Sequence, residues 1–129
     1  MNLRTISPLA FLGLLALGGC RSDPYAIDTI ADPVQKARFS CQYLLERSLA
    51  LAADKDADGV LRRRIADFAE PRVEADGPQV RTRWDADEIV LRRDGSRHQG
   101  GCLMTLRPQG RQVEAVDMDG RPLPAGFGM

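Results

Sequence analysis

Histidine, lysine and aromatic residues are scarce in this chain of 129 residues. There is one histidine, aromatic residues make up 5% of the chain, and two of the 18 basic residues are lysine. The 18 acidic residues balance the basic ones to a formal net charge of zero. Proteins that bind nucleic acid through phosphates carry a clustered positive excess. The sequence therefore argues against a nucleic-acid partner.

Residues that could carry catalysis are equally few. His98 lies in the polar stretch Gly95 to Gly101, with no second ligand or orienting acid at a recognisable spacing, so we predict a surface loop histidine. Serine hydrolase, Walker and dinucleotide motifs are absent. Because no acid/base pair or nucleophile can be named, the sequence predicts a protein that is not an enzyme and takes no cofactor.

Apolar runs are short except near the start of the chain. Arg4 precedes an uncharged run from Pro8 to Leu17, which is about half of the roughly 20 residues that a membrane-spanning helix needs. Two glycines and Cys20 follow that run. A positive leader, a short apolar segment and small residues before a cleavage point are the layout of a secretory signal.

The four residues Leu17-Gly18-Gly19-Cys20 resemble the lipobox of bacterial lipoproteins. The resemblance implies cleavage before Cys20, a lipid on its thiol and a further acyl chain, such as palmitate, on its amine. It also implies sorting to the periplasmic face of the outer membrane, because Arg21 follows where an aspartate would retain the protein at the inner membrane. The alternative is an ordinary signal peptide cut near Gly18 or Gly19. We predict a signal peptide over residues 1–19 and a lipidated tether over 20–31.

The remaining cysteines, Cys41 and Cys102, form an even pair once Cys20 is assigned to lipid. In an oxidising compartment such a pair predicts one disulfide. The alternatives are two buried free thiols or a redox pair, although no Cys-x-x-Cys motif is present.

A long helix is predicted to begin at Asp32-Pro33, because aspartate caps free backbone amides and proline fits the first helical position. Apolar and small residues follow at helical spacing, on the same stripe as Cys41. They are Val34, Ala37, Leu44, Leu45, Ser48, Leu49 and Ala52. Phe39 and Tyr43 lie on the opposite side. They predict a partner-facing patch, or else a helix pinned between the sheet and a returning terminus.

From residue 72 onward the pattern changes to period two, with turn signals about every ten residues. The predicted strands are Arg72 to Ala75, Gln79 to Trp84, Glu88 to Arg93, Gly101 to Arg107 and Arg111 to Met118. In the last strand Val113 and Ala115 do not share a face with Val116 and Met118, which predicts either a bulge or a different strand boundary. The fold class is therefore α+β. One long N-terminal helix, with an optional short second helix over Val60 to Glu70, packs on a four- or five-stranded antiparallel meander. The single domain spans 32–119, and 120–129 is a loose tail.

Alternating aspartates at Asp54, Asp56 and Asp58 resemble the start of an EF-hand calcium loop. The resemblance fails at the twelfth position, where Ile65 replaces the bidentate glutamate. Three arginines, 62–64, add positive charge nearby. We therefore predict a polar loop between elements and no metal site, with these aspartates as the calcium candidate.

These features together predict a non-catalytic lipoprotein, anchored to the membrane by lipid, that serves as an accessory or binding module of the cell envelope. Its partner would be another envelope protein or peptidoglycan. The contact would be made through Phe39 and Tyr43 or through the arginine runs 62–64 and 92–93 with Arg97. The alternative is an inhibitor of a periplasmic hydrolase such as lysozyme, presenting paired charges on the loop Arg93 to Gly101.

Overall fold

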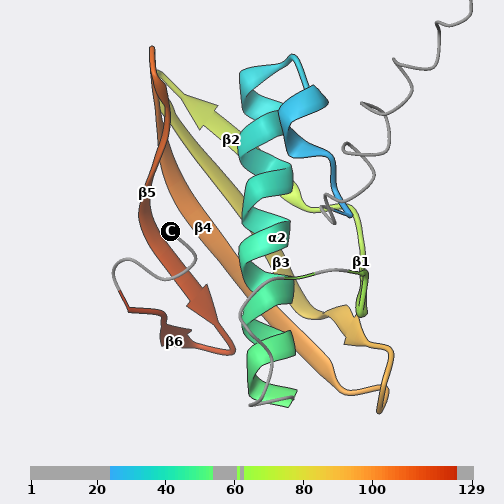
Figure 1. Cartoon of the computed structure of the whole chain (residues 1–129). Helices are drawn as coiled ribbons and strands as arrows, with labels where there is room; N and C mark the ends of the chain where they lie inside the picture. Colours follow the sequence, from blue (N-terminus) through green and yellow to red (C-terminus); the bar gives the residue numbers. More distant parts are fainter. Residues whose placement is uncertain (1–23, 54–60, 62, 125–129) are drawn as a thin grey trace, which may run out of the picture.

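The computed structural model describes residues 24–53, 61 and 63–124. It has two layers: one α-helix lies across one face of a six-stranded antiparallel sheet (Figure 1). The predicted α+β class is confirmed. In chain order the elements are η2 (Ile27–Thr29), α2 (Pro33–Ala53), β1 (Ala66–Phe68), β2 (Arg72–Asp76), β3 (Gln79–Leu91), β4 (Arg97–Arg107), β5 (Gly110–Met118) and β6 (Arg121–Pro122).

Helix α2 begins where the sequence predicts. The Asp32 carboxylate accepts a hydrogen bond from the backbone N–H of Val34 at 3.2 Å, which caps the first turn. Most of the predicted stripe faces the sheet and is buried, although Val34 and Ser48 are half-buried and Ala52 is exposed. The buried members are Ala37, Cys41, Leu44, Leu45 and Leu49.

Cys41 and Cys102 form a disulfide between α2 and β4, with their Cα atoms 5.8 Å apart. The predicted pairing is confirmed. Both residues belong to the core between helix and sheet, where Trp84 and Met104 are also almost completely buried. The bond closes a sequence separation of 61 residues, so it restricts the unfolded chain strongly.

Strand β3 is the centre of the sheet. β4 pairs with it on one side, while β2 pairs with its first half and β1 with its second half on the other side. β4, β5 and β6 then follow as a meander. The sheet thus extends past residue 119, where the sequence places the end of the domain, because β6 pairs with the end of β5.

The predicted break at residues 85–87 is wrong, since β3 continues through it. The β3–β4 register shifts between Trp84 and Ile89, and Asp87 adopts φ 68°. Trp84 and Ile89 are an odd number of positions apart, yet both are fully buried. The irregularity changes the phase of the alternation, so one strand can direct both side chains to the core.

The optional second helix is also wrong for the described residues between 61 and 70, which contain strand β1 instead. Ala66–Phe68 pairs with the end of β3, and the Phe68 ring packs edge-on against Trp84 with centroids 5.1 Å apart. The Trp84 Nε1–H donates to the carbonyl of Ala69 at 2.7 Å. These tertiary contacts outweigh the helical spacing of Leu61, Ile65 and Phe68.

The predicted bulge in the last long strand is confirmed. Leu103 pairs with Ala115 and Met104 with Val113, so Glu114 is the additional residue in β5. Val116 and Met118 beyond the bulge are both buried. Within the part of the chain that the structure describes, no helix is long and apolar enough to span a membrane.

Breaking the disulfide should destabilise this domain substantially. We expect Cys41→Ala/Cys102→Ala to lower the free energy of unfolding by about 4 kcal/mol, because a loop of this length is released in the unfolded state. Urea denaturation followed by Trp84 fluorescence measures the change. Cys20→Ala, outside the pair, is the matched control and should shift stability by less than about 0.5 kcal/mol. Equal effects of the two variants would contradict the prediction.

Candidate functional site

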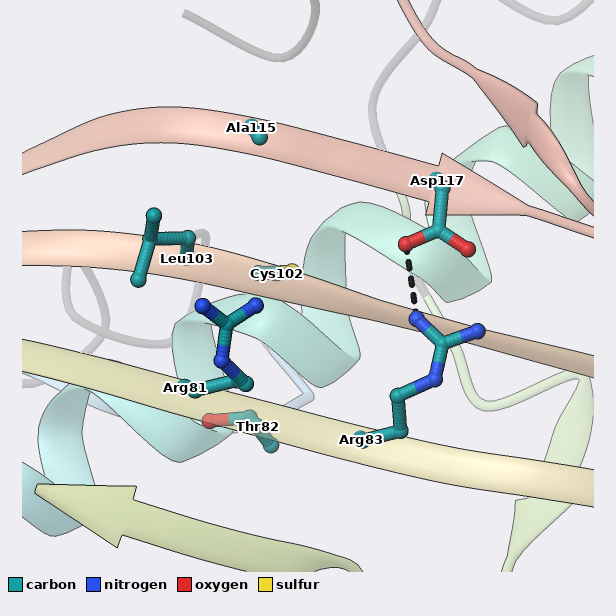
Figure 2. A pocket seen from close by; sticks show the side chains of 7 residues that line it. All are labelled: Arg81, Thr82, Arg83, Cys102, Leu103, Ala115 and Asp117. Carbon is teal, nitrogen blue, oxygen red and sulfur yellow. Dashed lines mark hydrogen bonds and ion pairs between the residues drawn. The ribbon is translucent and has the colours of Figure 1, made fainter.

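The sheet face that α2 does not cover carries a shallow hollow of about 50 Å³. Figure 2 shows two arginines on β3 and an aspartate on β5, with β4 between them. The residues that line it are Arg81, Thr82, Arg83, Cys102, Leu103, Ala115 and Asp117.

Gly101 makes the hollow possible. It pairs with Arg83 on one side and Asp117 on the other. A Cβ atom at position 101 would lie 2.5 Å from the Thr82 carbonyl oxygen and 3.1 Å from Arg83 Nη1. Because that atom is missing, the Arg83 guanidinium crosses β4 and donates to Asp117 Oδ1 at 2.8 Å. This hydrogen bond raises the pKa of Arg83 above its ordinary value.

Arg81 differs from Arg83 because no ion pair among the described residues fixes its side chain. It is exposed, and its cross-strand neighbours are Glu74 and Leu103. Among the described residues the Arg81 side chain forms no hydrogen bond or ion pair. The hollow thus places the Arg81 guanidinium, which no ion pair holds, beside the Arg83 guanidinium, which Asp117 holds in position. A guanidinium in such a place fits a carboxylate or a phosphate, which it binds in a planar fork.

The size of the hollow restricts what it can hold. Small-molecule and cofactor pockets usually measure several hundred Å³. A hollow of about 50 Å³ admits only a group the size of one side chain or one acidic substituent. The site therefore fits an acidic group presented by a larger partner.

Part of this site could be predicted from the sequence. Arg81 and Arg83 alternate with buried residues of β3, so the period-two pattern directs both to the solvent side. The ion pair between Arg83 and Asp117 could not be predicted from the sequence, because the two residues lie on strands separated by β4. We did not single out either arginine from the sequence.

A second cluster surrounds Glu46, which is completely buried on α2. Its carboxylate accepts hydrogen bonds from Arg64 Nε at 2.9 Å and from the backbone N–H of Ala66 at 2.8 Å. The backbone N–H of Ile65 and the Tyr25 hydroxyl also donate to it. A buried carboxylate is stable only with such a set of donors. Sequence analysis missed this residue, since an isolated glutamate in a helix normally faces water.

Tyr25 is the most distant member of this cluster along the chain. Burial, followed by the hydrogen bond to the Glu46 carboxylate, raises the pKa of Tyr25 far above its ordinary value. The phenol therefore stays protonated and donates a hydrogen bond to the Glu46 carboxylate. The Arg64 guanidinium carbon also lies 4.9 Å from the centroid of the Tyr25 ring, a cation–π contact.

Tyr25 also lies against the two helix aromatics that the sequence marks as a partner-facing patch. Its ring centroid is 6.5 Å from that of Phe39 and 6.0 Å from that of Tyr43. Phe39 and Tyr43 are both half-buried. The segment before the helix thus returns along α2 and covers part of this patch, which agrees with the alternative of a helix pinned by a returning terminus.

His98 has partners that the sequence did not indicate. It lies on β4, with Nδ1 2.8 Å from Asp119 Oδ2 and Nε2 2.9 Å from Ser96 Oγ. The prediction that this histidine lacks an orienting acid is therefore wrong. The order serine, histidine, aspartate is that of a nucleophilic triad, which is recognised by geometry.

The surroundings of Ser96 do not favour a nucleophile. Hydrogen bonds from Ser96, first from its side chain and then from its backbone N–H, hold the pKa of the Asp94 carboxyl below its ordinary value. The backbone N–H groups of Gly95 and Ser96 donate to Leu91 and Asp94, so neither is free to stabilise an oxyanion. We interpret the arrangement as a clamp that joins the β3–β4 turn to Asp119 in the β5–β6 turn.

The other predicted site residues are not brought together. Cys20 and the calcium candidates Asp54, Asp56 and Asp58 lie outside the described residues. Within residues 24–53, 61 and 63–124 no cluster of potential metal ligands occurs. The arginine runs are divided among separate contacts, since Arg64 binds Glu46 and Arg92 binds Asp67 at 2.8 Å.

The chain was compared with protein-family models, with curated proteins and with solved structures, and none of the three comparisons finds a match.

The Glu46 cluster should be much more important for stability than a surface ion pair. We expect Glu46→Gln to lower the free energy of unfolding by about 3 kcal/mol, because an amide NH₂ would face buried donors. Glu70→Gln is the matched control. Its side chain is 86% exposed and 3.5 Å from Arg38, so the change should be below about 1 kcal/mol. Chemical denaturation measures both, and similar losses would refute the distinction.

Proposed function

We propose that this protein is a non-catalytic lipoprotein on the periplasmic face of the outer membrane, where it binds an acidic group of another envelope component through its open sheet face. The observation that supports this most directly is Arg81, an exposed guanidinium without a partner among the described residues, beside the fixed Arg83–Asp117 pair. Lipidation of Cys20 is supported by the lipobox resemblance. The disulfide fits an oxidising compartment.

The acidic partner group can belong to a protein side chain or to peptidoglycan, whose stem peptides carry carboxylates. In both cases the contact is charge-assisted, so it weakens with salt. The hollow is too small for a free cofactor. The hypothesis therefore assigns Arg81 to recognition and Arg83, held by Asp117, to shaping the site.

The anchor is tested by metabolic labelling. Full-length chain expressed in a Gram-negative host should incorporate labelled palmitate, and Cys20→Ala should lose the label because the acceptor thiol is removed. Cys41→Ala/Cys102→Ala is the matched control and should retain it. Label that persists in Cys20→Ala would contradict the proposed anchor.

The binding face is tested by capture from envelope extract. The soluble domain Arg21 to Met129 and its Arg81→Glu variant are compared, with Arg107→Glu as a control of the same charge change on the exposed end of β4. We expect Arg81→Glu to reduce capture of a specific component about tenfold, a loss typical of a central interface arginine. Equal capture by all three proteins would contradict the assignment of Arg81.

A second candidate is inhibition of a periplasmic hydrolase such as lysozyme, which requires a rigid loop with paired charges. The β3–β4 turn has this character. The backbone N–H of Gly95 donates to Leu91 and that of Leu91 to Ser96, while the His98–Asp119 contact fixes the adjoining strand. The Arg93 to Gly101 stretch is shorter as a loop than the sequence predicts, because β4 begins at Arg97.

This candidate predicts that the purified domain slows cell-wall lysis by a muramidase at micromolar concentration. Asp119→Asn should weaken inhibition, because the bond that fixes His98 loses its charge. Asp76→Asn, at the end of β2, is the matched control. Unchanged lysis in the presence of the unmodified domain would rule out this candidate.

A further inference from the structure

The point where the chain enters the folded domain is fixed by Tyr25. Its ring lies over α2 against Phe39 and Tyr43, and its hydroxyl donates to the buried Glu46. In Figure 1 the short blue segment that contains η2 runs beside the first half of α2. Tyr25 therefore belongs to the helical layer, and the open sheet face with Arg81 lies on the other side of the sheet.

The distance from this point to the proposed anchor is short. Tyr25 is five residues after Cys20. A fully extended chain spans at most about 3.5 Å per residue, so Cys20 cannot be further than about 18 Å from Tyr25. This is comparable to the thickness of one helix packed on one sheet, roughly 20 Å. A lipid on Cys20 would thus hold the helical layer next to the bilayer.

The side of α2 that faces away from the sheet has the composition of a membrane-contacting surface. Lys36, Phe39, Tyr43 and Arg47 follow at spacings of three and four residues, and we call them the outer helix face. All four are half-buried. Aromatic rings and long basic side chains are favoured where hydrocarbon meets anionic headgroups.

No acidic side chain of α2 opposes this surface. The one acidic residue of the helix is Glu46, which is fully buried and paired with Arg64. The basic residues of the outer helix face are Lys36 and Arg47, and Tyr25 covers part of its aromatic rings. The exposed acidic residues next to it in the chain, Asp28 and Asp32, belong to the segment before the helix. Each basic residue near an anionic lipid surface adds electrostatic attraction.

We propose that the outer helix face lies against anionic lipid headgroups, so that α2 faces the membrane and the hollow at Arg81 points into the periplasm. This inference rests on the proposed lipid anchor at Cys20. Its physical basis is the Tyr25 contact, the short reach of the tether and the charge of the outer helix face. The occupant of this surface is a lipid bilayer that contains phosphatidylglycerol.

Depth-dependent quenching tests the orientation. Full-length chain purified from membranes is reconstituted in phosphatidylglycerol vesicles with brominated acyl chains, which quench nearby tryptophan. Trp84 is completely buried in the core and provides a constant background. Phe39→Trp places a reporter on the outer helix face, and Leu103→Trp places the matched reporter on the open sheet face.

We expect Phe39→Trp to lose fluorescence in brominated vesicles relative to unbrominated ones, while Leu103→Trp keeps its fluorescence. Quenching of both reporters, of neither, or of Leu103→Trp alone would overturn the proposed orientation. A second copy or an envelope protein on the outer helix face would leave Phe39→Trp unquenched and would appear as a cross-linked species. That outcome also overturns it.

The contribution of charge is tested with the unanchored domain. Lys36→Gln should reduce partitioning onto phosphatidylglycerol vesicles about fivefold, the effect of one basic residue near an anionic surface. Arg107→Gln, the same charge change on the other side of the molecule, should leave partitioning unchanged. Equal reductions of partitioning by the two variants, or no reduction by either, would contradict a specific contact between the outer helix face and the lipid.

Failure of this inference can be separated from failure of the anchor. If the purified full-length chain lacks an acyl group by mass spectrometry, the lipoprotein proposal fails. The orientation can still be measured by attaching Cys20, the cysteine outside the disulfide, to a maleimide lipid in the same vesicles. Quenching of Phe39→Trp in that preparation supports the orientation, and its absence overturns it.

Discussion

The buried carboxylate of Glu46 is the interaction on which the arrangement of this protein depends. Moving a charge into the protein interior costs several kcal/mol, which only a full set of donors offsets. Those donors come from separated parts of the chain: Tyr25 from the entering segment, and Arg64 and the amides of Ile65 and Ala66 from the start of β1. One side chain therefore fixes the helix, the first strand and the entry of the chain relative to one another.

Two adjacent glycines in β4, Gly100 and Gly101, give the two faces of the sheet different surfaces. A Cβ at Gly100 would lie 3.4 Å from the Leu45 side chain and 2.6 Å from the Asp117 carbonyl oxygen, so its absence lets α2 approach closely. Gly101 points the other way and leaves room for Arg83 to reach Asp117. Tight packing on one face and an arginine-lined hollow on the other thus result from neighbouring positions. The proposed membrane contact and the proposed partner site occupy these opposite sides.

The sequence by itself determined the features that depend on neighbours along the chain. The Asp32 cap and the helical stripe predict the start and the buried side of α2, because the relevant contacts lie within a few residues. Period-two alternation predicts most strands, and its change of phase after Ala115 predicts a bulge or a boundary in the last long strand, which the register places at Glu114 as a bulge. The disulfide could be predicted by counting cysteines, because the lipobox resemblance sets Cys20 aside and leaves one pair.

Only the tertiary structure decided the features that join distant segments. The helical spacing of residues 61–68 favours a helix, but donors at Ile65 and Ala66 bind Glu46, and Phe68 packs on Trp84, so the segment contains a strand. His98 contacts Asp119, and Arg83 donates to Asp117, across strands whose register the hydrophobic pattern of the sequence does not specify. Local energies specify a helix start or an alternation, whereas charge pairing and burial depend on which distant residues the completed fold brings together.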